Sequence, residues 1–510
     1  MTINPNIALY SYIKSKYTSS FFITFIVFFT LSILFRLPHF LSNSFWFDGD
    51  EAIVGIMAQD LLAGSSFPMY FYGQNYGLSI FEASTVAIWI KLIGTGIWAL
   101  RLGGLTLFAL GTTFIFKGLI NRGISSKISF AITLGVLCFP TWMLWGSMVR
   151  GGYVTALCAI SILFFLTGKI KFTLPYHLLI GFVLAVAFES HAFLLIPILP
   201  LLLLNWFEQK GNILNLFKVL VIWGLFVIVL KSLNFQTNYW SSPALNLDFS
   251  KFSERITIYG KGILNSFGSF YFYTINIEIP GWWQFGLGIS FILLLFLLIN
   301  SFIGCSKTQK LFFLFSLLLM LPILFVALSM KNYTPRYMIS IYTGILFILL
   351  FFPNQLINNR LNRFFSIRLL FIFLIGIGVG SKFKRDFSPS DANKINAFSE
   401  LHKVVINGKY KGVFVCDNLM QWQWNYLYGN EIPANGFRLT ERTMRFTKKV
   451  ESIYNFNPKK TAIVGYWGLF YGIDYIHGFN DTRKQIANDY FIQPIVTKAF
   501  HDKGYFEMAE

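Results

Sequence analysis

Long apolar segments recur over the first three quarters of this chain and constrain its fold more than any other feature. They lie near residues 21–40, 79–97, 99–119, 128–147, 152–168, 175–206, 214–232, 286–304, 310–330, 335–353 and 366–381. Most approach the roughly 20 residues that a helix needs to cross a bilayer. Charged residues make up only 13% of the chain, about half the share in a soluble protein. The sequence therefore predicts an all-α polytopic membrane domain with about 11–13 transmembrane helices.

Two of these segments depart from a simple span. The run 175–206 is long for one helix and is interrupted by Glu189, Ser190 and His191, which favours two short passes. The run 79–97 carries Glu82 and Lys91, which favours partial insertion. Basic clusters near 117–127, 169–171, 307–310 and 360–368 are typical of cytoplasmic loops. No simple count of spans places all of these clusters on one side.

The N-terminal segment is predicted to stay attached as the first membrane helix. Lys14 and Lys16 precede the run 21–40, which is too long for a signal-peptide core and has no Ala-x-Ala cleavage pattern. The lysines indicate a cytoplasmic N-terminus, so the loop that follows is expected outside the membrane.

The net charge of +19 does not indicate nucleic-acid binding. The basic residues lie mostly in short loops between apolar runs, where they suit membrane orientation and anionic lipid headgroups. The cysteines Cys138, Cys158, Cys305 and Cys416 are widely spaced and form neither a metal-binding pattern nor a disulfide framework.

The composition changes at Lys382. The rest of the chain has 18 Lys and Arg against 13 Asp and Glu, with β-like runs such as GVFVCDN and TAIVGYW. We therefore predict a transmembrane domain over 1–381, with outer loops at about 41–80 and 232–285, and a soluble extracytoplasmic α/β domain over 382–510.

Acidic residues are concentrated in the first outer loop. Before Lys382 the chain has ten carboxylates, and five of them lie between residues 45 and 82: Asp48, Asp50, Glu51, Asp60 and Glu82. Any one of them alone is typical of a solvated loop. Their concentration beside an apolar body indicates chemistry instead.

Several motifs resemble the integral-membrane glycosyltransferases of the GT-C fold. They are FDGDEAIVGIMAQDLLAG in the first loop, FYGQNYGLSIFEA and GTGIWALRLGG after it, RGGYVTAL and TPRYMISIY further on, and DNLMQWQWNYLYGNEI in the tail. The chain is similar to the bacterial branch that resembles dolichyl-phosphate-mannose–protein mannosyltransferases and is related to the aminoarabinose transferase acting on lipid A. The first loop is the most specific part of this resemblance.

The resemblance implies a reaction at the outer face of a bacterial cytoplasmic (inner) membrane. A sugar on a polyprenyl-phosphate lipid is transferred, with inversion, to a hydroxyl of a glycan, lipid or protein acceptor. No cofactor is certain, and a divalent metal such as Mg²⁺ or Mn²⁺ stays open, because related transferases differ. The carrier's exact length, the sugar and the acceptor are not fixed by the motifs.

The reaction needs a base and fixed positive charge. A hydroxyl nucleophile must lose its proton, and Asp50 matches the first acid of the family's Asp-Glu pair, with Glu51 orienting it or the acceptor. The leaving phosphate needs cations, for which the candidates in order are Arg336, Arg150 and Arg101. Arg101, like Arg36, is equally typical of a snorkelling side chain.

Further candidates are expected to contact the sugar or the acceptor: Asp48, Tyr72, Gln74, Tyr76, Glu82 and His191. Other roles compete with this one, since Asp48 suits a helix cap, the tyrosines suit interfacial anchors and His191 suits a packed histidine. At the level of the whole chain, the alternatives are a lipid-linked sugar flippase or transporter, another polysaccharide ligase or polymerase, and a non-catalytic relative. The early acidic loop favours an enzyme over these.

Overall fold

A computed structural model gives the structure of the chain. It describes residues 5–41, 49–64, 69–72, 76–169, 172–233, 249–250, 252–253, 255–256, 281–329, 338–352, 394–415, 418–436, 461–466, 496–497 and 506–509.

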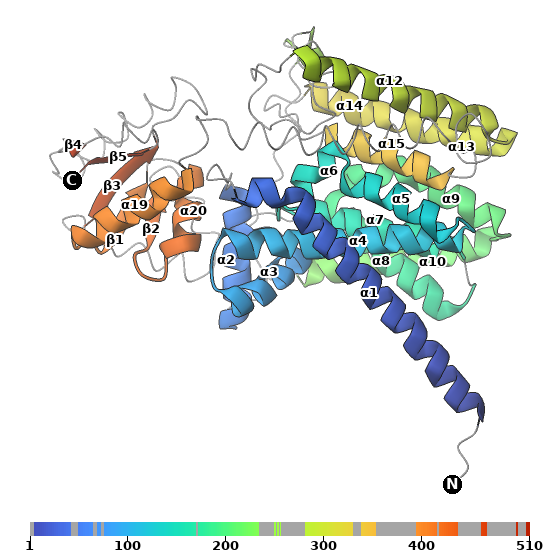
Figure 1. The fold of residues 1–510 in the computed structure, drawn as a ribbon, viewed down its shortest axis with the longest axis horizontal. Coiled ribbons are helices and arrows are strands. Elements are labelled where there is room, and N and C mark those ends of the chain that lie inside the picture. The colour runs from blue at the N-terminus through green and yellow to red at the C-terminus, as the bar shows by residue number, and fades with distance from the viewer. Residues whose placement is uncertain are drawn as a thin grey trace.

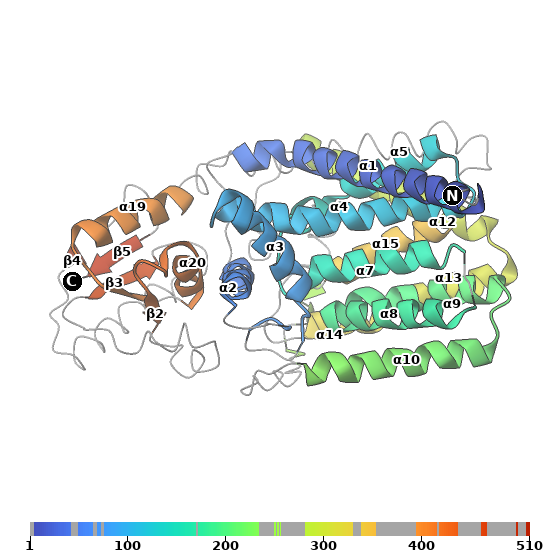
Figure 2. The same ribbon diagram turned by 90° about the horizontal axis from the view of Figure 1, so that it is seen from below.

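The described part of the first 352 residues is mostly helical, and its helices other than the one at Gly49–Ala63 follow the predicted apolar runs (Figure 1). The helices are α1 (Pro5–Leu41), α2 (Gly49–Ala63), α3 (Ile80–Ile93), α4 (Ile97–Asn121), α5 (Ser126–Leu137), α6 (Pro140–Trp145), α7 (Tyr153–Leu166), α8 (Leu174–Leu195), the 3-10 helix η1 (Ile196–Ile198), α9 (Leu199–Glu208), α10 (Ile213–Ser232), α12 (Gly281–Gly304), α13 (Lys307–Leu318), α14 (Met320–Ser329) and α15 (Ile339–Phe351). Most of them lie side by side in one bundle (Figure 2). The predicted span 366–381 lies outside the described residues.

Five helical stretches of the described chain are long and apolar enough to cross a membrane: Ser20–Leu37, Ile97–Asn121, Leu174–Glu208, Ile213–Ser232 and Lys307–Val326. Shorter apolar helices accompany them at Ser126–Leu137, Tyr153–Leu166, Leu294–Gly304 and Ile339–Phe351. The chain is a multi-pass membrane protein, as its apolar periodicity predicts.

The stretch from Leu174 to Glu208 folds back on itself at His191. A continuous helix would separate residues 177 and 206 by about 43 Å, at 1.5 Å per residue. Instead, the ring centroids of His177 and Trp206 lie 6.0 Å apart. The reversal is at His191, whose backbone angles of φ −163° and ψ 89° are not helical. The stretch therefore forms two short legs that meet at His191, at the interruption seen in the sequence.

This reversal brings basic clusters to one end of the bundle. Side-chain hydrogen bonds join the helix ends there: Lys117 Nζ to Ser20 Oγ (2.9 Å), Arg122 Nη2 to Thr167 Oγ1 (3.2 Å), Gln209 Nε2 to Thr167 O (2.5 Å) and Gln309 Nε2 to Glu208 Oε1 (2.8 Å). The clusters at 117–127 and 307–310, together with Lys169, thus share the end at which α1 begins. The cluster at 360–368 lies outside the described residues.

The C-terminal part forms a small α/β unit, as predicted. Its elements are α19 (Lys394–Asn407), β1 (Gly412–Val415), α20 (Asn418–Tyr428), β2 (Ala434–Gly436), β3 (Thr461–Tyr466), β4 (Val496–Thr497) and β5 (Phe506–Ala509). The sheet order is β2-β1-β3-β5-β4, in which β1 is parallel to β2 and β3, while β5 is antiparallel to β3 and β4. Buried side chains such as Leu401, Val405 and Trp424 give this unit a core of its own. The predicted domain boundary at 381/382 lies outside the described residues.

Helix α2 connects the bundle to this unit. Figure 2 shows α2 between α3 and α20, and both helices pack against it. From Glu51 to Asp60, α2 is buried at every position. Asp50, Glu51 and Asp60 of the acidic first loop thus lie on a largely buried helix at the junction of the two parts.

Candidate active site

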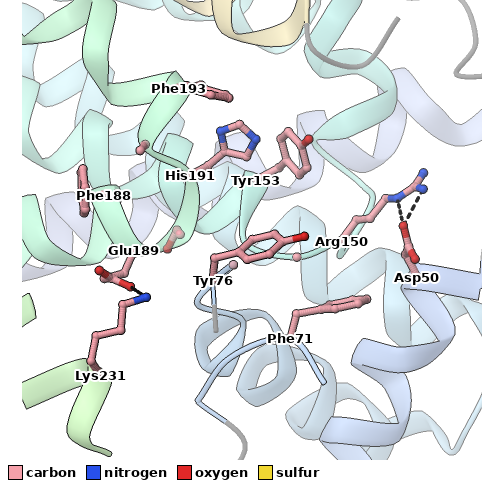
Figure 3. A pocket seen from close by; sticks show the side chains of 14 residues that line it. Asp50, Phe71, Tyr76, Arg150, Tyr153, Phe188, Glu189, His191, Phe193 and Lys231 are labelled. Carbon is pink, nitrogen blue, oxygen red and sulfur yellow. Dashed lines mark hydrogen bonds and ion pairs between the residues drawn. The ribbon is translucent and has the colours of Figure 1, made fainter. Parts of the chain in front are cut away.

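A cavity of about 440 Å³ opens where the first loop meets α7, α8 and α10 (Figure 3). Its lining comes from several segments far apart in the chain: Asp50; Phe71, Tyr76 and Gly77; Arg150, Gly151 and Tyr153; Phe188, Glu189, Ser190, His191, Ala192 and Phe193; and Lys231. Charged groups and aromatic rings share this lining, as is typical of a site for a polar ligand with an apolar face.

Glycines let three of these segments meet backbone to backbone. Gly77, Gly151 and Gly152 have positive φ angles of 72°, 66° and 91°, a region that favours glycine. A Cβ on Gly77 would lie 2.8 Å from Gly151 O, and one on Gly152 would lie 2.8 Å from Ser190 O. The Gly-Gly pair after Arg150 therefore lets the backbone pack closely and brings that arginine to the cavity.

Asp50 and Arg150 form an ion pair at the cavity wall. The Arg150 Nε and Nη2 groups donate to Asp50 Oδ2 at 2.9 and 2.6 Å. Asp50 is in the first turn of α2, where the positive end of the helix dipole favours a carboxylate. Its side chain is 28% exposed, against 3% for Arg150. The two residues predicted as base and phosphate ligand are therefore direct partners.

A second ion pair lines another part of the cavity in Figure 3. Lys231 Nζ lies 2.7 Å from Glu189 Oε2, which also accepts a bond of 2.9 Å from Tyr70 Oη. The ammonium group is 4.8 Å from the centre of the Tyr70 ring. The Glu189 backbone carbonyl accepts from Gly77 and Leu78, both at 3.1 Å. Glu189 thus ties the first loop to α8 while holding Lys231 at the cavity.

The break in α8 turns His191 toward the cavity, where it meets aromatic side chains. Its ring centroid lies 4.2 Å from that of Tyr153 and 6.2 Å from that of Phe193. Tyr76, which is 45% exposed, lies on the first-loop side of the same cavity. Aromatic faces of this kind suit stacking against sugar rings or an isoprenoid chain.

Glu51 and Arg101 do not line the cavity. They form a bidentate pair, with Arg101 Nη1 2.9 Å from Glu51 Oε1 and Nη2 donating to Oε2 at 3.0 Å, and both side chains are fully buried. Asp50 and Glu51 are adjacent in the sequence but therefore lie in different surroundings. Arg36 is also structural, since it donates to the carbonyls of Ser32, Leu137, Trp142 and Met143.

Glu82 and Tyr72 also bond within the scaffold. Glu82 is buried and accepts from the backbone N–H groups of Gly152 (3.2 Å) and Thr155 (3.4 Å), at the start of α7. Burial raises the pKa of Glu82 to about 7, although these N–H bonds oppose the rise. Tyr72 Oη donates to the buried Asp60 at 2.7 Å. Both residues hold the first loop in place without lining the cavity.

The other predicted site residues, Asp48, Gln74 and Arg336, lie outside the described residues. Sequence reasoning gave no site role to Lys231, which ends an ordinary apolar run. For Glu189, the sequence predicts only an interruption of the apolar run 175–206. The signal available for Glu189 was its rarity, because it is the first acid after Glu82 in the chain.

Asp50, Glu189 and His191 line the cavity, but the described residues contain no group of three or more His, Cys, Asp or Glu side chains placed to hold a metal ion.

The fold of the chain matches that of solved ArnT structures over nearly its whole length. The structure is similar to the crystal structure of ArnT from Cupriavidus metallidurans bound to undecaprenyl phosphate, with a TM-score of 0.57 and 12% identity, over 97% of this chain and 98% of that one. The apo structure of the same ArnT gives a TM-score of 0.55 with the same identity and coverage. The fold class expected from the sequence resemblance is confirmed.

Neither a protein-family model nor a curated protein sequence matches the chain. At 12% identity the similarity to ArnT lies in the fold.

Proposed function

We propose that this protein is a membrane glycosyltransferase that takes a sugar from a polyprenyl-phosphate donor and joins it, with inversion, to an acceptor hydroxyl. The observation that carries the proposal is the Asp50–Arg150 pair at the wall of an aromatic-lined cavity. It couples a carboxylate to a guanidinium where a proton acceptor and an anion ligand are both required. The ArnT structure of the same fold holds undecaprenyl phosphate, which supports a polyprenyl donor.

In the proposed reaction, the acceptor oxygen attacks the anomeric carbon as the bond from that carbon to the phosphate oxygen breaks. Asp50 takes the hydroxyl proton, and the lipid leaves as polyprenyl monophosphate. Because the leaving phosphate gains negative charge, cations already fixed in the cavity stabilise the transition state more than the ground state.

Arg150 and Lys231 are the cations that we assign to the phosphate. Each holds a carboxylate at the cavity, Asp50 at 2.6 Å and Glu189 at 2.7 Å. An arriving phosphate competes with these carboxylates for the same N–H groups. When it engages Arg150, it loosens the guanidinium's hold on Asp50, so donor binding makes the base more available.

In the proposed orientation, this cavity lies at the outer face of the cytoplasmic membrane. The basic clusters near Lys117, Lys169 and Lys307 share one end of the bundle with the start of α1, which the positive-inside rule assigns to the cytoplasm. The cavity and the α/β unit then face outward, where the lipid-linked sugar would be used.

The test uses purified protein in lipid nanodiscs with a panel of polyprenyl-phosphate sugars and an envelope extract as acceptor. Free polyprenyl phosphate is followed by mass spectrometry for wild type, Asp50→Asn and the control Asp60→Asn. Asp60 shares helix α2 with Asp50, but it bonds to Tyr72.

We expect turnover in wild type and Asp60→Asn. Asp50→Asn should lose about 10²- to 10⁴-fold in kcat, the range for a general base, while still binding undecaprenyl phosphate. Full activity in Asp50→Asn would remove Asp50 as the base. If wild type and both variants bind the lipid but none of them turns over a donor, the result would favour a flippase or a non-catalytic relative.

A further inference from the structure

Tyr426 of α20 links the C-terminal unit to the acid-bearing helix α2. This residue is separated from its partners on α2 and α4 by more than 300 positions, and its side chain is 1% exposed. The contact is part of the main core of the bundle, which includes Trp422 and Tyr426 beside the membrane helices.

The Tyr426 ring lies directly against the backbone of α2. A Cβ added at Gly55 would be 2.4 Å from the Cδ2 and Cε2 atoms of this ring, so only glycine leaves room for it. One turn further along α2, Gln59 Nε2 donates to the backbone carbonyl of Tyr426 at 3.0 Å. Ring and backbone of Tyr426 are thus both fixed to α2.

The Tyr426 hydroxyl binds the start of α4. It donates to Gly96 O at 2.9 Å and accepts from Gly96 N at 3.3 Å. Gly96 is the N-cap of α4, the helix that carries Arg101. Tyr426 therefore joins the two helices that bear the buried Glu51–Arg101 pair. Burial raises the pKa of Tyr426 and the charge of Glu51 adds to the rise, so the phenol stays protonated and lies within electrostatic reach of that carboxylate.

Resting on the proposed function, we infer that Tyr426 is a positioning residue for the reaction, through which the C-terminal unit sets the placement of α2 and of Asp50 at the cavity. Asp50 and Glu51 begin α2, and the Tyr426 contacts at Gly55 and Gln59 hold the same helix one and two turns away. Small displacements of a reacting group reduce rates strongly. The C-terminal unit is then part of the active-site scaffold and not a separate binding module.

The test compares Tyr426→Phe, which keeps the ring and removes the bonds to Gly96, with Tyr428→Phe in the same helix. Tyr428 stacks on His402 at 3.9 Å, within the C-terminal unit. Gly55→Ala is a second variant, because its methyl group displaces the Tyr426 ring while the hydroxyl is retained. Each protein is measured for kcat, KM, thermal stability, undecaprenyl phosphate binding and hydrogen exchange in residues 49–63.

We expect Tyr426→Phe to lower kcat about fivefold, because both hydrogen bonds to Gly96 are lost, and to speed exchange in α2. KM, lipid affinity and Tm should match Tyr428→Phe. Gly55→Ala should lower kcat further, by about tenfold or more. Equal kcat in Tyr426→Phe and Tyr428→Phe would overturn the inference. So would a joint fall of kcat, Tm and lipid binding, which indicates a structural role alone.

Failure of the proposed function is distinguishable from failure of this inference. If wild type turns over no donor, the proposed function fails, and hydrogen exchange still decides the role of Tyr426. Faster exchange in α2 of Tyr426→Phe than of Tyr428→Phe, with α7 unchanged, would support positioning. Equal exchange in both variants would contradict it.

Discussion

Asp50 and Glu51 are neighbours in the sequence, and each is paired with an arginine, yet their surroundings differ. The Asp50–Arg150 pair lines the cavity, and the aspartate side chain is 28% exposed. The Glu51–Arg101 pair has both side chains fully buried, away from that cavity. One helical step of about 100° separates the two acids and directs them to different sides of α2.

In the proposed function, Asp50 supplies the catalytic carboxylate, while the adjacent Glu51 belongs to a buried structural ion pair. The Asp50–Arg150 pair can exchange partners with a ligand, because both residues line the cavity that the ligand would enter. A fully buried pair cannot, because separating its charges leaves one of them desolvated. Variants of the Asp50–Arg150 pair should therefore lose activity, and variants of the Glu51–Arg101 pair should lose stability.

The largest effect is expected from breaking the buried pair. Glu51→Gln removes the carboxylate partner of a buried guanidinium and should destabilise the protein by about 3–5 kcal/mol. Replacing both residues, as Glu51→Leu with Arg101→Leu, should recover most of this loss. Thermal unfolding in detergent, followed by fluorescence, measures both variants. A Tm for Glu51→Gln equal to that of wild type would contradict the scaffold role.

Glu82 extends the comparison to a buried acid held by backbone N–H groups. Its pKa is raised to about 7, so the folded protein holds a proton that the unfolded chain has released above pH ~4.5. This contribution to stability is full below pH ~4.5 and is lost as the pH rises through 7. The loss is on the order of 3 kcal/mol, since one pKa unit corresponds to about 1.4 kcal/mol.

Glu82→Gln keeps an acceptor for Gly152 and Thr155 but cannot titrate. Its Tm should therefore fall less than that of wild type between pH 5 and 8. Glu82→Ala, which removes the acceptor, should be less stable than Glu82→Gln at both pH values. Parallel pH curves for wild type and Glu82→Gln would exclude Glu82 as the titrating group.

Much of this architecture could be predicted from hydropathy alone. The run predicted at 99–119 is α4 at Ile97–Asn121, and the ESH interruption marks the reversal at His191. Side-chain pairing could not be predicted. Arg101 and Arg150 both lie within two residues of a Gly-Gly pair in the sequence, and only the fold pairs one with Glu51 and the other with Asp50. Such contacts join residues 50 or 100 positions apart, which local pattern does not encode.

Arg150→Lys should lower activity more than stability, which would distinguish the Asp50–Arg150 pair from the Glu51–Arg101 pair. Lysine keeps the charge but loses the fork by which Nε and Nη2 both reach Asp50. We expect kcat/KM to fall by about 10- to 100-fold, or about 1.4–2.8 kcal/mol, with little change in Tm. Arg101→Lys is the matched variant, and it should lower Tm more than Arg150→Lys does. The reverse pattern would place the catalytic pair at Glu51–Arg101.

The smallest effect is expected at the other cation of the cavity, Lys231, whose side chain is 42% exposed. Lys231→Met should weaken undecaprenyl phosphate binding about tenfold, or about 1.4 kcal/mol, because one of two cations assigned to the phosphate is lost. The charge-preserving variant Lys231→Arg should bind the lipid nearly as wild type does. Isothermal titration in nanodiscs measures each Kd.

Two controls separate phosphate binding by Lys231 from its contact with Glu189. The double variant Lys231→Met with Glu189→Gln leaves no carboxylate without its cation partner, so it should bind the lipid as weakly as Lys231→Met alone. Added salt should narrow the difference in Kd between wild type and Lys231→Met. The attraction between exposed charges is screened by ions, with a Debye length of about 10 Å at 0.1 M that shortens as salt is added. If the double variant regained wild-type affinity, Lys231 would serve only to neutralise Glu189. Arg150 would then hold the phosphate without it, and the chemistry of the cavity would rest on the Asp50–Arg150 pair alone.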